Sequence, residues 1–221
     1  MKALRLIAAA AVVVAFGICG VRAQAQGISE DPHGAITPRT MPADIQGLGL
    51  APDFTLTDQK GNTVKLSDLK GKVVVLEWTY PNCPFVQRHY KAGTMARLAK
   101  TYAEKGVVWL AINSTYNMNR EDDAAWAEKQ KIAYPVLGDH DGKVGKAYGA
   151  KTTPHMFVID AKGNIVYRGA IDGNRSLENK EGAVNYVALA LDAVLAGKPV
   201  AIPETKSYGC SVKYAPEPMA K

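Results

Sequence analysis

The order of apolar and polar residues divides the central part of the chain into strands and helices. Nearly continuous apolar runs occur at 72–79 and 107–113, and we expect them to be central strands that are covered on both faces. The segments 54–66 and 156–168 each contain two strand-type runs around a glycine-containing turn, which predicts two hairpins. A further short strand is expected at 134–137.

Helices are expected between and after these strands, and in two of them apolar residues recur every three or four positions. One long helix is expected to begin at Pro84 and to end before Gly106. Others are expected at 119–131, 141–148 and 184–195. The first of these three has acidic residues at its start, where they complement the positive end of the helix dipole.

Strands that alternate with helices predict an α/β fold with crossover connections, and the hairpin at 156–168 makes the sheet mixed. At 221 residues, one domain with a sizeable core is expected, and we place it at 48–197. Glycine, proline and small polar residues predict an irregular lead-in at 26–47. A proline-rich tail that contains Cys210 follows at 198–221.

The N-terminus has the three parts of a secretory signal peptide. A basic start is followed by an apolar core at 6–18 and by a small-x-small cleavage site at 23–25. The core is shorter than an ordinary membrane span. We therefore expect residues 1–25 to be cleaved near Ala25, and the protein to be periplasmic or secreted. The alternative is that residues 1–25 stay uncleaved and anchor the protein in the membrane. If they are cleaved, we expect the protein to contact the membrane only during export.

Removal of this segment changes the charge of the chain. The full sequence has 27 Lys and Arg against 21 Asp and Glu, a net charge of +6. Residues 1–25 contain three basic residues and no acidic one, so the mature chain would carry +3. The sequence has no basic cluster interleaved with aromatic residues, and we expect no nucleic-acid partner.

Cysteine usage points to redox chemistry. Three cysteines are encoded, and because Cys19 would leave with the signal peptide, Cys83 and Cys210 remain. In an oxidising compartment two cysteines of one chain are more often paired than separate. A bond between them is either a structural staple of the tail or a redox-active pair. The two interpretations differ only in how easily the bond is reduced.

Cys83 lies where the strand at 72–79 meets the long helix. Pro84 suits the first helical position, because its missing N–H has no partner to lose there. A thiol at this junction faces unpaired backbone N–H groups and the positive end of the helix dipole, which favours the thiolate. Cys83 is therefore a candidate nucleophile, and a small buried hydrophobic residue is the alternative interpretation.

The order of these features resembles the thioredoxin superfamily. The resemblance rests on Trp78 before a turn, Cys83 at a helix start and the sequence Thr-Thr-Pro at 152–154 before the second hairpin. Within the superfamily, Ala-Pro-Asp-Phe-Thr-Leu at 51–56 is similar to the redoxin branch, which includes the alkyl hydroperoxide reductase/thiol-specific antioxidant (AhpC/TSA) family and periplasmic thioredoxin-like reductases. The resemblance covers about 48–197. It implies a thioredoxin-like three-layer fold with an N-terminal hairpin extension and an irregular C-terminal tail.

The resemblance also implies a substrate site. In this superfamily the proline of the Thr-Pro loop is usually cis and lies against the active cysteine, so Pro154 would lie beside Cys83. The backbone of Thr153 would then pair with a bound substrate strand. Trp78 and Tyr80 would shape the site.

The sequence departs from both well-known signatures of the superfamily. Val86 stands where thioredoxins have their second cysteine, so no local dithiol can form. Tyr80 stands where peroxiredoxins have a threonine or serine, and Leu76 stands where they have a proline. The peroxiredoxin arginine has no obvious counterpart. Arg88 and Arg168 are candidates by proximity, but we interpret both as solvated charges.

These observations predict a thiol-disulfide oxidoreductase. The Cys83 thiolate would attack a disulfide or oxidised thiol of a protein or small molecule, and Cys210 or an external thiol would resolve the mixed disulfide. An electron donor that the sequence does not identify would complete the cycle. The alternative is a peroxiredoxin-like antioxidant peroxidase that acts on peroxides, with a sulfenic acid on Cys83.

A copper-binding or assembly protein on the same fold is a lesser alternative. Cys83, Cys210, His89 and His155 would be its ligands, but thioredoxin-fold copper chaperones carry two close cysteines. We therefore expect no metal, and no organic cofactor is implied. His89 is interpreted as a packed or surface residue, whereas His155 lies closer to the expected site and is a candidate to tune the thiolate.

Glu77 is unusual within an apolar strand. A buried carboxylate at this position would be able to relay protons to the thiols. A lysine partner or an exposed strand face is the simpler interpretation.

Overall fold

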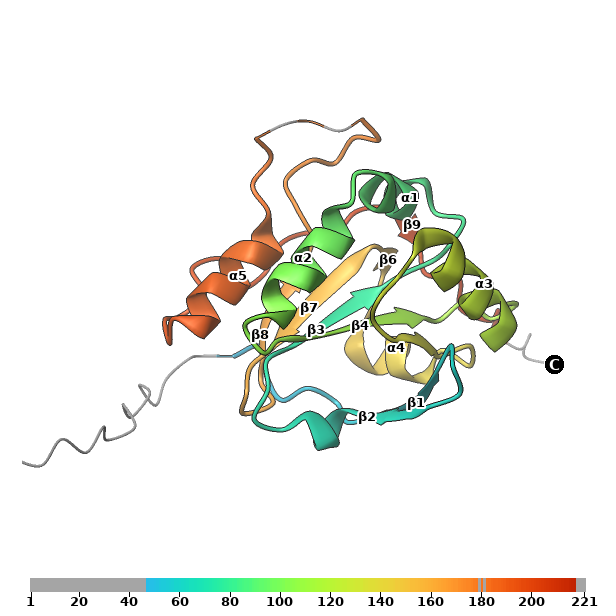
Figure 1. The fold of residues 1–221 in the computed structure, drawn as a ribbon, viewed down its shortest axis with the longest axis horizontal. Helices are drawn as coiled ribbons and strands as arrows, with labels where there is room; N and C mark the ends of the chain where they lie inside the picture. Colours follow the sequence, from blue (N-terminus) through green and yellow to red (C-terminus); the bar gives the residue numbers. More distant parts are fainter. Residues whose placement is uncertain (1–46, 179, 181, 218–221) are drawn as a thin grey trace, which may run out of the picture. The chain divides into compact units, whose positions relative to one another are not determined.

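A seven-stranded mixed sheet forms the centre of the fold (Figure 1). The computed structural model describes residues 47–178, 180 and 182–217. The expected signal peptide at 1–25 and nearly all of the lead-in at 26–47 lie outside the described residues. The strands are β1 (Thr55–Asp58), β2 (Thr63–Lys65), β3 (Val74–Trp78), β4 (Val108–Asn113), β5 (Val136–Gly138), β6 (Thr152–Thr153), β7 (His155–Ile159), β8 (Ile165–Gly169) and β9 (Cys210–Ser211).

The large sheet has the strand order β2-β1-β5-β4-β3-β7-β8, and β6 pairs with β9 separately. Strands β3, β4 and β5 are parallel neighbours, whereas β7 runs antiparallel to β3. The hairpins β1–β2 and β7–β8 are antiparallel, as the sequence predicts. The expected mixed sheet is therefore confirmed, and β3 lies between β4 and β7 with no exposed edge.

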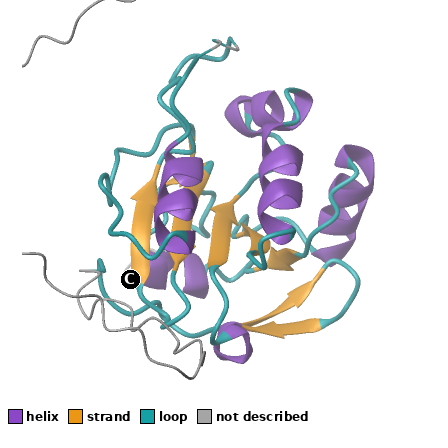
Figure 2. Ribbon diagram, turned by 60° about the vertical axis from the view of Figure 1, so that its left-hand side comes forward, coloured by secondary structure: helices purple, strands orange, loops and turns teal. Residues whose placement is uncertain are grey.

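Helices cover both faces of this sheet (Figure 2). They are α1 (Pro84–Lys91), α2 (Thr94–Ala103), α3 (Arg120–Gln130), α4 (Lys143–Tyr148) and α5 (Tyr186–Leu195), together with a 3-10 helix, η1 (Leu66–Leu69). Residues of α1, α2, α3 and α5 pack on one face, whereas α4 and η1 pack on the other. This is the three-layer arrangement that the sequence predicts.

The single long helix expected after Cys83 is wrong. The structure has two helices, α1 and α2, and Gly93 lies between them with a φ of 65°. Residues with a side chain rarely adopt this left-handed conformation, whereas glycine does so readily. The apolar spacing continues across the break, which is why periodicity alone does not reveal it.

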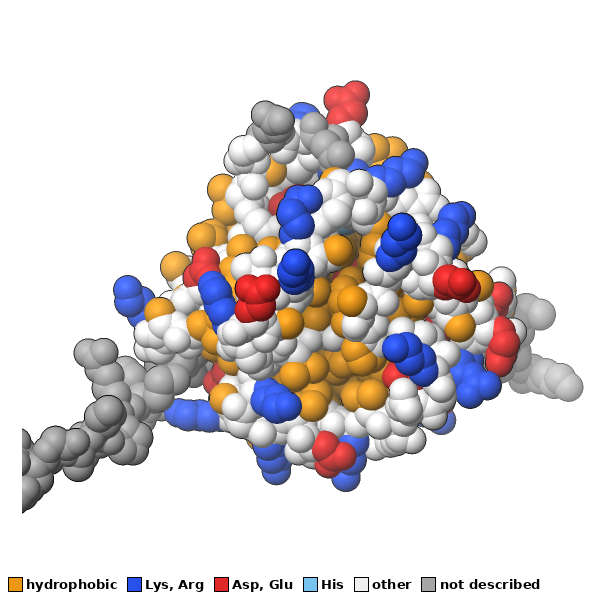
Figure 3. Space-filling model, viewed as in Figure 1, with side chains coloured by type: hydrophobic (Ala, Val, Ile, Leu, Met, Phe, Trp, Pro, Cys, Tyr) orange, Lys and Arg blue, Asp and Glu red, His pale blue; other side chains and the backbone are white. Residues whose placement is uncertain are grey.

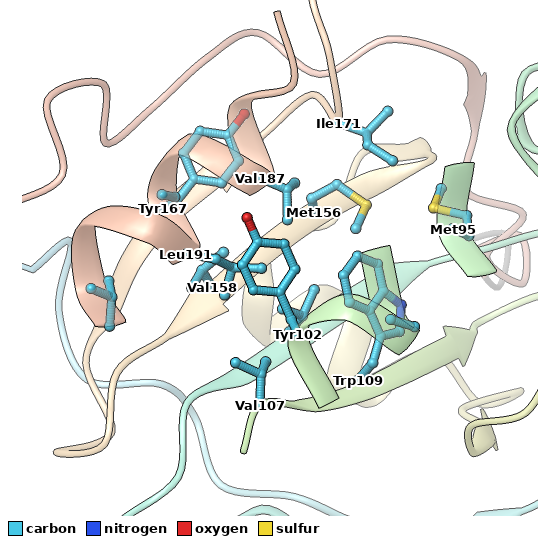
Figure 4. Packing of buried hydrophobic residues seen from close by; sticks show 14 of the residues in the cluster. Met95, Tyr102, Val107, Trp109, Met156, Val158, Tyr167, Ile171, Val187 and Leu191 are labelled. Carbon is cyan, nitrogen blue, oxygen red and sulfur yellow. The ribbon is translucent and has the colours of Figure 1, made fainter. Parts of the chain in front are cut away.

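The larger of the two sheet cores lies beneath α2 and α5. Figure 4 shows how Tyr102, Trp109, Met156 and Leu191 point toward one another there. On the opposite face, Trp78 packs with aromatic residues of α4 and β7. Within the described residues, no helix combines the length and the apolar character that a membrane crossing requires.

The tail at 198–217 is irregular apart from β9, as the sequence predicts, but it packs against the rest of the domain. All described residues, including this tail, fall in one compact unit. Tyr208 and Val212 are buried in the cores on the two faces of the sheet. Between them, Cys210 and Ser211 form β9. A two-residue strand is too short to show the alternation by which strands are recognised in a sequence.

Candidate active site

Cys83 lies at the N-terminus of α1, just beyond the carboxyl end of β3. It is the N-cap residue, with an extended backbone, and Pro84 occupies the first turn. The backbone N–H of Cys83 donates to the carbonyl of Tyr80 at 3.0 Å and closes the turn between strand and helix. The predicted strand–turn–helix position of the cysteine is therefore confirmed, and its side chain is fully buried.

The loop at 152–154 lies against this cysteine. The peptide bond between Thr153 and Pro154 is cis, as the resemblance implies. The Cys83 thiol donates to the carbonyl oxygen of Thr153, with 2.9 Å between sulfur and oxygen. A hydrogen bond of the thiol thus connects the start of α1 with the proline loop, which is distant along the chain.

Cys210 reaches the same residue from the tail. In the antiparallel ladder of β6 and β9, Cys210 lies opposite Thr153. Its half-buried side chain packs against the apolar cluster that contains Cys83. Both cysteines are thiols in this structure, so the bond between them that the sequence favours is not formed here.

The two thiols differ in acidity. Burial alone raises the pKa of Cys83, but hydrogen bonds from the Cys210 thiol and from the backbone N–H of Val86 stabilise the thiolate and bring this pKa below its ordinary value. Burial, the hydrogen bond to Cys83 and the negative charge of its thiolate raise the pKa of Cys210 to about 11. Cys83 therefore ionises first.

Gly209 allows the tail to approach this closely. Its φ is 123°, and a Cβ atom at this position would lie 2.1 Å from the carbonyl oxygen of Thr153. This oxygen belongs to the rigid backbone of the proline loop and is also the acceptor of the Cys83 thiol. A side chain at residue 209 would therefore separate β9 from β6.

The two aromatic residues assigned to the site lie in different places. Tyr80 is half-buried and packs against the cluster that contains Cys83. The Trp78 ring lies in the core on the other face of the sheet, and its Nε1–H donates to Ser114 Oγ at 3.0 Å. Tyr80 thus lies on the Cys83 side of the sheet, whereas the Trp78 ring lies on the opposite side.

Glu77 is a buried carboxyl, so the simpler sequence-based interpretation, a lysine partner or an exposed strand face, is wrong. Its oxygens accept from Tyr90 Oη at 2.9 Å, Trp109 Nε1 at 2.9 Å and Tyr134 Oη at 3.2 Å. Burial raises the pKa of Glu77 to about 7, although these three hydrogen bonds oppose the rise. At neutral pH the protonated and ionised forms of Glu77 are therefore both populated.

The three donors to Glu77 also line a groove of about 610 Å³ between α2 and the segment after α3. Figure 3 shows apolar side chains gathered near the middle of this face of the protein. The carboxyl thus lies beneath an apolar surface and is connected to it by hydroxyl and indole groups.

The interpretation of Arg88 as a solvated charge is also wrong. Its side chain is buried, and its guanidinium donates to backbone carbonyls and to Tyr208 of the tail. His89 is a packed residue, as expected, and burial with the adjacent Arg88 charge lowers its pKa to about 4. Arg168 does lie at the surface, where it pairs with Glu204 at 2.9 Å.

His155 is buried on the other side of the proline loop. Its Nδ1 accepts from the backbone N–H of Lys151 at 3.2 Å, and its ring packs against Phe157. Burial, followed by the charges of Lys151 and Arg168, lowers its pKa to about 4. Among the residues that the structure describes, no three His, Cys, Asp or Glu side chains gather as a metal site would require.

Comparison with known proteins identifies the class. The AhpC/TSA family model matches residues 49–168, more than half of the chain. The chain therefore belongs to the AhpC/TSA family, within the redoxin branch of the thioredoxin-like superfamily. It is a thiol-dependent oxidoreductase.

Two curated relatives and one solved structure are similar to this chain. The chain is 31% identical over 134 residues to the thiol-disulfide oxidoreductase ResA of Bacillus thuringiensis subsp. konkukian, an alignment that covers 59% of this chain and 72% of ResA. It is also similar to the thioredoxin-like protein YneN of Bacillus subtilis, with 33% identity over 116 residues, 52% of this chain and 66% of YneN. Among solved structures, an uncharacterized conserved protein from Geobacillus kaustophilus has a TM-score of 0.70 and 35% identity, covering 81% of this chain and 96% of that one.

Proposed function

We propose that this protein is an exported thiol-disulfide oxidoreductase, with Cys83 as the nucleophile and Cys210 as the resolving thiol. The observation that carries the proposal is the meeting of both cysteines at Thr153. Cys83 donates to its carbonyl, and Cys210 is its partner in the ladder. Similarity to ResA, whose name describes this activity, supports the same reaction class.

The acidities of the two thiols give the order of steps. The Cys83 thiolate attacks one sulfur of a substrate disulfide, forms a mixed disulfide and releases the other half as a thiolate. Cys210 then loses its proton and attacks the sulfur of Cys83, which expels the second half of the substrate. Two electrons pass from the protein to the substrate, and a Cys83–Cys210 disulfide remains until an external thiol donor reduces it.

The substrates that we propose are disulfides of proteins or small molecules. The backbone of Thr153 belongs to a strand edge that pairs with β9 in this structure, and the same edge would suit an extended peptide segment once the tail leaves it. Tyr80 packs beside Cys83 and would contact a substrate that reaches the thiol. Export to the periplasm or beyond the cell rests on the N-terminal sequence pattern, and it would supply the oxidising surroundings in which such a pair cycles.

The peroxidase alternative has less support at the thiol. Arg88 is nearby in sequence, but its guanidinium is held by carbonyl groups and by Tyr208. Tyr80 stands where peroxiredoxins have a threonine or serine. Efficient cleavage of a peroxide O–O bond needs hydrogen-bond donors directed at the peroxide, and the Arg88 guanidinium is held away from that task by its other partners.

Stopped-flow kinetics of the reduced protein tests the proposal. We expect small-molecule disulfides to oxidise the wild-type protein faster than hydrogen peroxide does at equal concentration. Cys83→Ser should abolish the reaction, and Cys210→Ser should stop it at a mixed disulfide. Oxidation by peroxide at the rates of efficient peroxiredoxins would assign the protein to that class instead.

A further inference from the structure

The tail of this protein occupies the position that a substrate strand would take. Strand β9 pairs antiparallel with β6, with Cys210 opposite Thr153 and Ser211 opposite Thr152. This edge lies directly before the cis bond to Pro154. Figure 1 shows β9 beside β6 and close to the start of α1. No partner can pair with this edge while β9 is there.

A buried tyrosine holds the tail on one side of Cys210. The Tyr208 hydroxyl accepts from Arg88 Nη2 at 2.8 Å, lies 3.1 Å from His89 Nε2 and donates to the Asp172 carboxylate. Its ring also packs edge-on against Phe85. Three of these partners belong to α1, the helix that Cys83 begins, so the same helix holds both the thiol and the tail.

The Tyr208 hydroxyl binds to a buried cation, Arg88, and to its carboxylate partner, Asp172. Arg88 is buried, and its guanidinium lies 3.6 Å from the Asp172 carboxylate. It also donates to the carbonyls of Asn174, at 3.0 Å, and of Ser176. Loss of a hydrogen-bond partner of a buried charge lowers the stability of the folded state, because the charge then lies away from water without compensation. The Tyr208 hydroxyl is one of these partners, and it is the only one of these groups that the tail supplies among the described residues.

A second anchor follows Cys210. Val212 is buried, and its N–H donates to the carbonyl of Lys151 at 3.1 Å. Tyr214 donates to the carbonyl of Ala150 at 2.9 Å. Residues 209–211 therefore form a short bridge between two fixed points. The bridge passes over the proline loop at the site of the thiol.

While residues 209–211 are docked, the more reactive thiol is not the one that solvent reaches. Cys83 is the thiol that ionises more readily, yet none of its surface is exposed. Cys210 is partly exposed, but burial and its contact with Cys83 keep it protonated, with a pKa of about 11. A disulfide in solution therefore meets the less reactive thiol first, and it reaches the more reactive one only when the tail undocks.

We propose that Tyr208, with Arg88, His89 and Asp172, is a latch that docks the tail in the partner-strand position and so gates access to Cys83. A partner whose extended strand carries a disulfide pairs with β6 in place of β9 when the latch opens. The Cys83 thiolate attacks one sulfur of that disulfide and releases the other as a thiolate. Once the partner strand has left β6, the tail redocks and returns Cys210 to the mixed disulfide on Cys83. The Cys210 sulfur bonds to the Cys83 sulfur, the substrate leaves as a thiolate, and the proton of Cys210 passes to solvent. The mixed disulfide and its resolution rest on the proposed function above, whereas the docking of the tail does not.

Alkylation of Cys83 by iodoacetamide in the reduced protein, followed by peptide mass spectrometry, tests the latch. Tyr208→Phe removes only the hydroxyl, and Gly209→Ala forces β9 away from Thr153. We expect each to raise the alkylation rate of Cys83 by about ten-fold or more, the change that corresponds to ~1.4 kcal/mol of lost docking energy. Tyr102→Phe is the matched control, because its hydroxyl donates to Asp192 at 2.9 Å in the same core and away from the tail.

Two results would overturn the latch. One is an unchanged alkylation rate in Tyr208→Phe and Gly209→Ala proteins whose thermal unfolding shows that they are folded. The other is an equal increase in Tyr102→Phe, which would indicate general loosening. Disulfide exchange, measured in parallel, separates this inference from the proposed function. Faster alkylation of Cys83 without any exchange activity would support the latch and reject the oxidoreductase. Disulfide exchange in variants whose Cys83 alkylation rate is unchanged would support the oxidoreductase and reject the latch.

Discussion

Glu77 should make the stability of this protein depend on pH. Its pKa is about 7 in the folded protein, against an ordinary value of 4.5. Since one pKa unit is worth ~1.4 kcal/mol, the folded state favours the protonated carboxyl by about 3 kcal/mol. This contribution is fully present below pH 4.5, where both states are protonated, and it is lost as the pH rises through 7. Stability should therefore fall across this interval.

Replacement of Glu77 by glutamine removes the titration and keeps the size of the side chain. The free energy of unfolding, measured with guanidinium chloride at a series of pH values, should fall by about 3 kcal/mol less in Glu77→Gln than in wild type between pH 4.5 and 8. Tyr90→Phe provides a second check. It removes a donor to the carboxylate, so the pKa of Glu77 should rise further and the fall in stability should move to higher pH.

Parallel stability curves for wild type and Glu77→Gln would refute this reasoning. They would mean that Glu77 titrates alike in the folded and unfolded states, and hence that water reaches the carboxyl in the folded protein. A wild-type curve that gains stability relative to the variant as the pH rises would be a stronger contradiction. It would mean that the three hydrogen bonds to the carboxylate outweigh its burial.

Four further predictions concern the thiols, the helix break and metal binding. Thiolate absorbance of the reduced protein, with Cys83→Ser as the control, should give Cys83 a pKa below the ~8.5 of a free cysteine; an unperturbed value would favour an inert buried residue. A Cys83–Cys210 disulfide closes a loop of 127 positions and should raise the free energy of unfolding by up to ~4–5 kcal/mol over the reduced protein. Equal stability of the oxidised and reduced forms in chemical denaturation would contradict it. Gly93→Ala should lower the free energy of unfolding by about 1 kcal/mol, since φ at residue 93 is 65°, and an unchanged midpoint would show that the break tolerates a side chain. Copper and zinc should bind weakly in equilibrium dialysis, and tight stoichiometric copper would support the metal-binding alternative.

The sequence predicts the parts of the site that depend on local patterns. The apolar run at 72–79 and Pro84 locate Cys83 at a helix start, because strand and helix periods differ and proline marks the first turn. The cis bond at Pro154 follows from resemblance rather than from local physics. Gly93 is a signal that was available in the sequence, since a glycine within a helical pattern often marks an end or a break.

The remaining parts depend on partners that are distant along the chain. Glu77 is buried because Trp109 and Tyr134 supply donors from other segments. Arg88 is buried because Tyr208, 120 positions further on, meets its guanidinium. Such burial is a property of tertiary contacts and leaves no periodic trace near either residue.

Strand alternation explains why the Trp78 ring lies on the opposite face of the sheet from Cys83. Successive side chains of a strand point to opposite faces, so Glu77 and Trp78 cannot both face the helix that Cys83 begins. The sequence does not reveal which of them does, because the turn at 79–82 can direct the chain toward either face. In the structure Glu77 lies on the side of α1 and α2, and the Trp78 ring lies in the opposite core.

Mass spectrometry of the Cys210→Ser protein after reaction with a small-molecule disulfide shows which cysteine is the nucleophile. We expect a stable adduct of half the disulfide on Cys83, with release of the other half as a thiol, whereas the wild-type protein proceeds to a Cys83–Cys210 bond. An unmodified Cys83 under these conditions, together with its rapid oxidation to sulfenic acid by peroxide, would show that Cys83 is a peroxidatic cysteine and not the nucleophile of disulfide exchange.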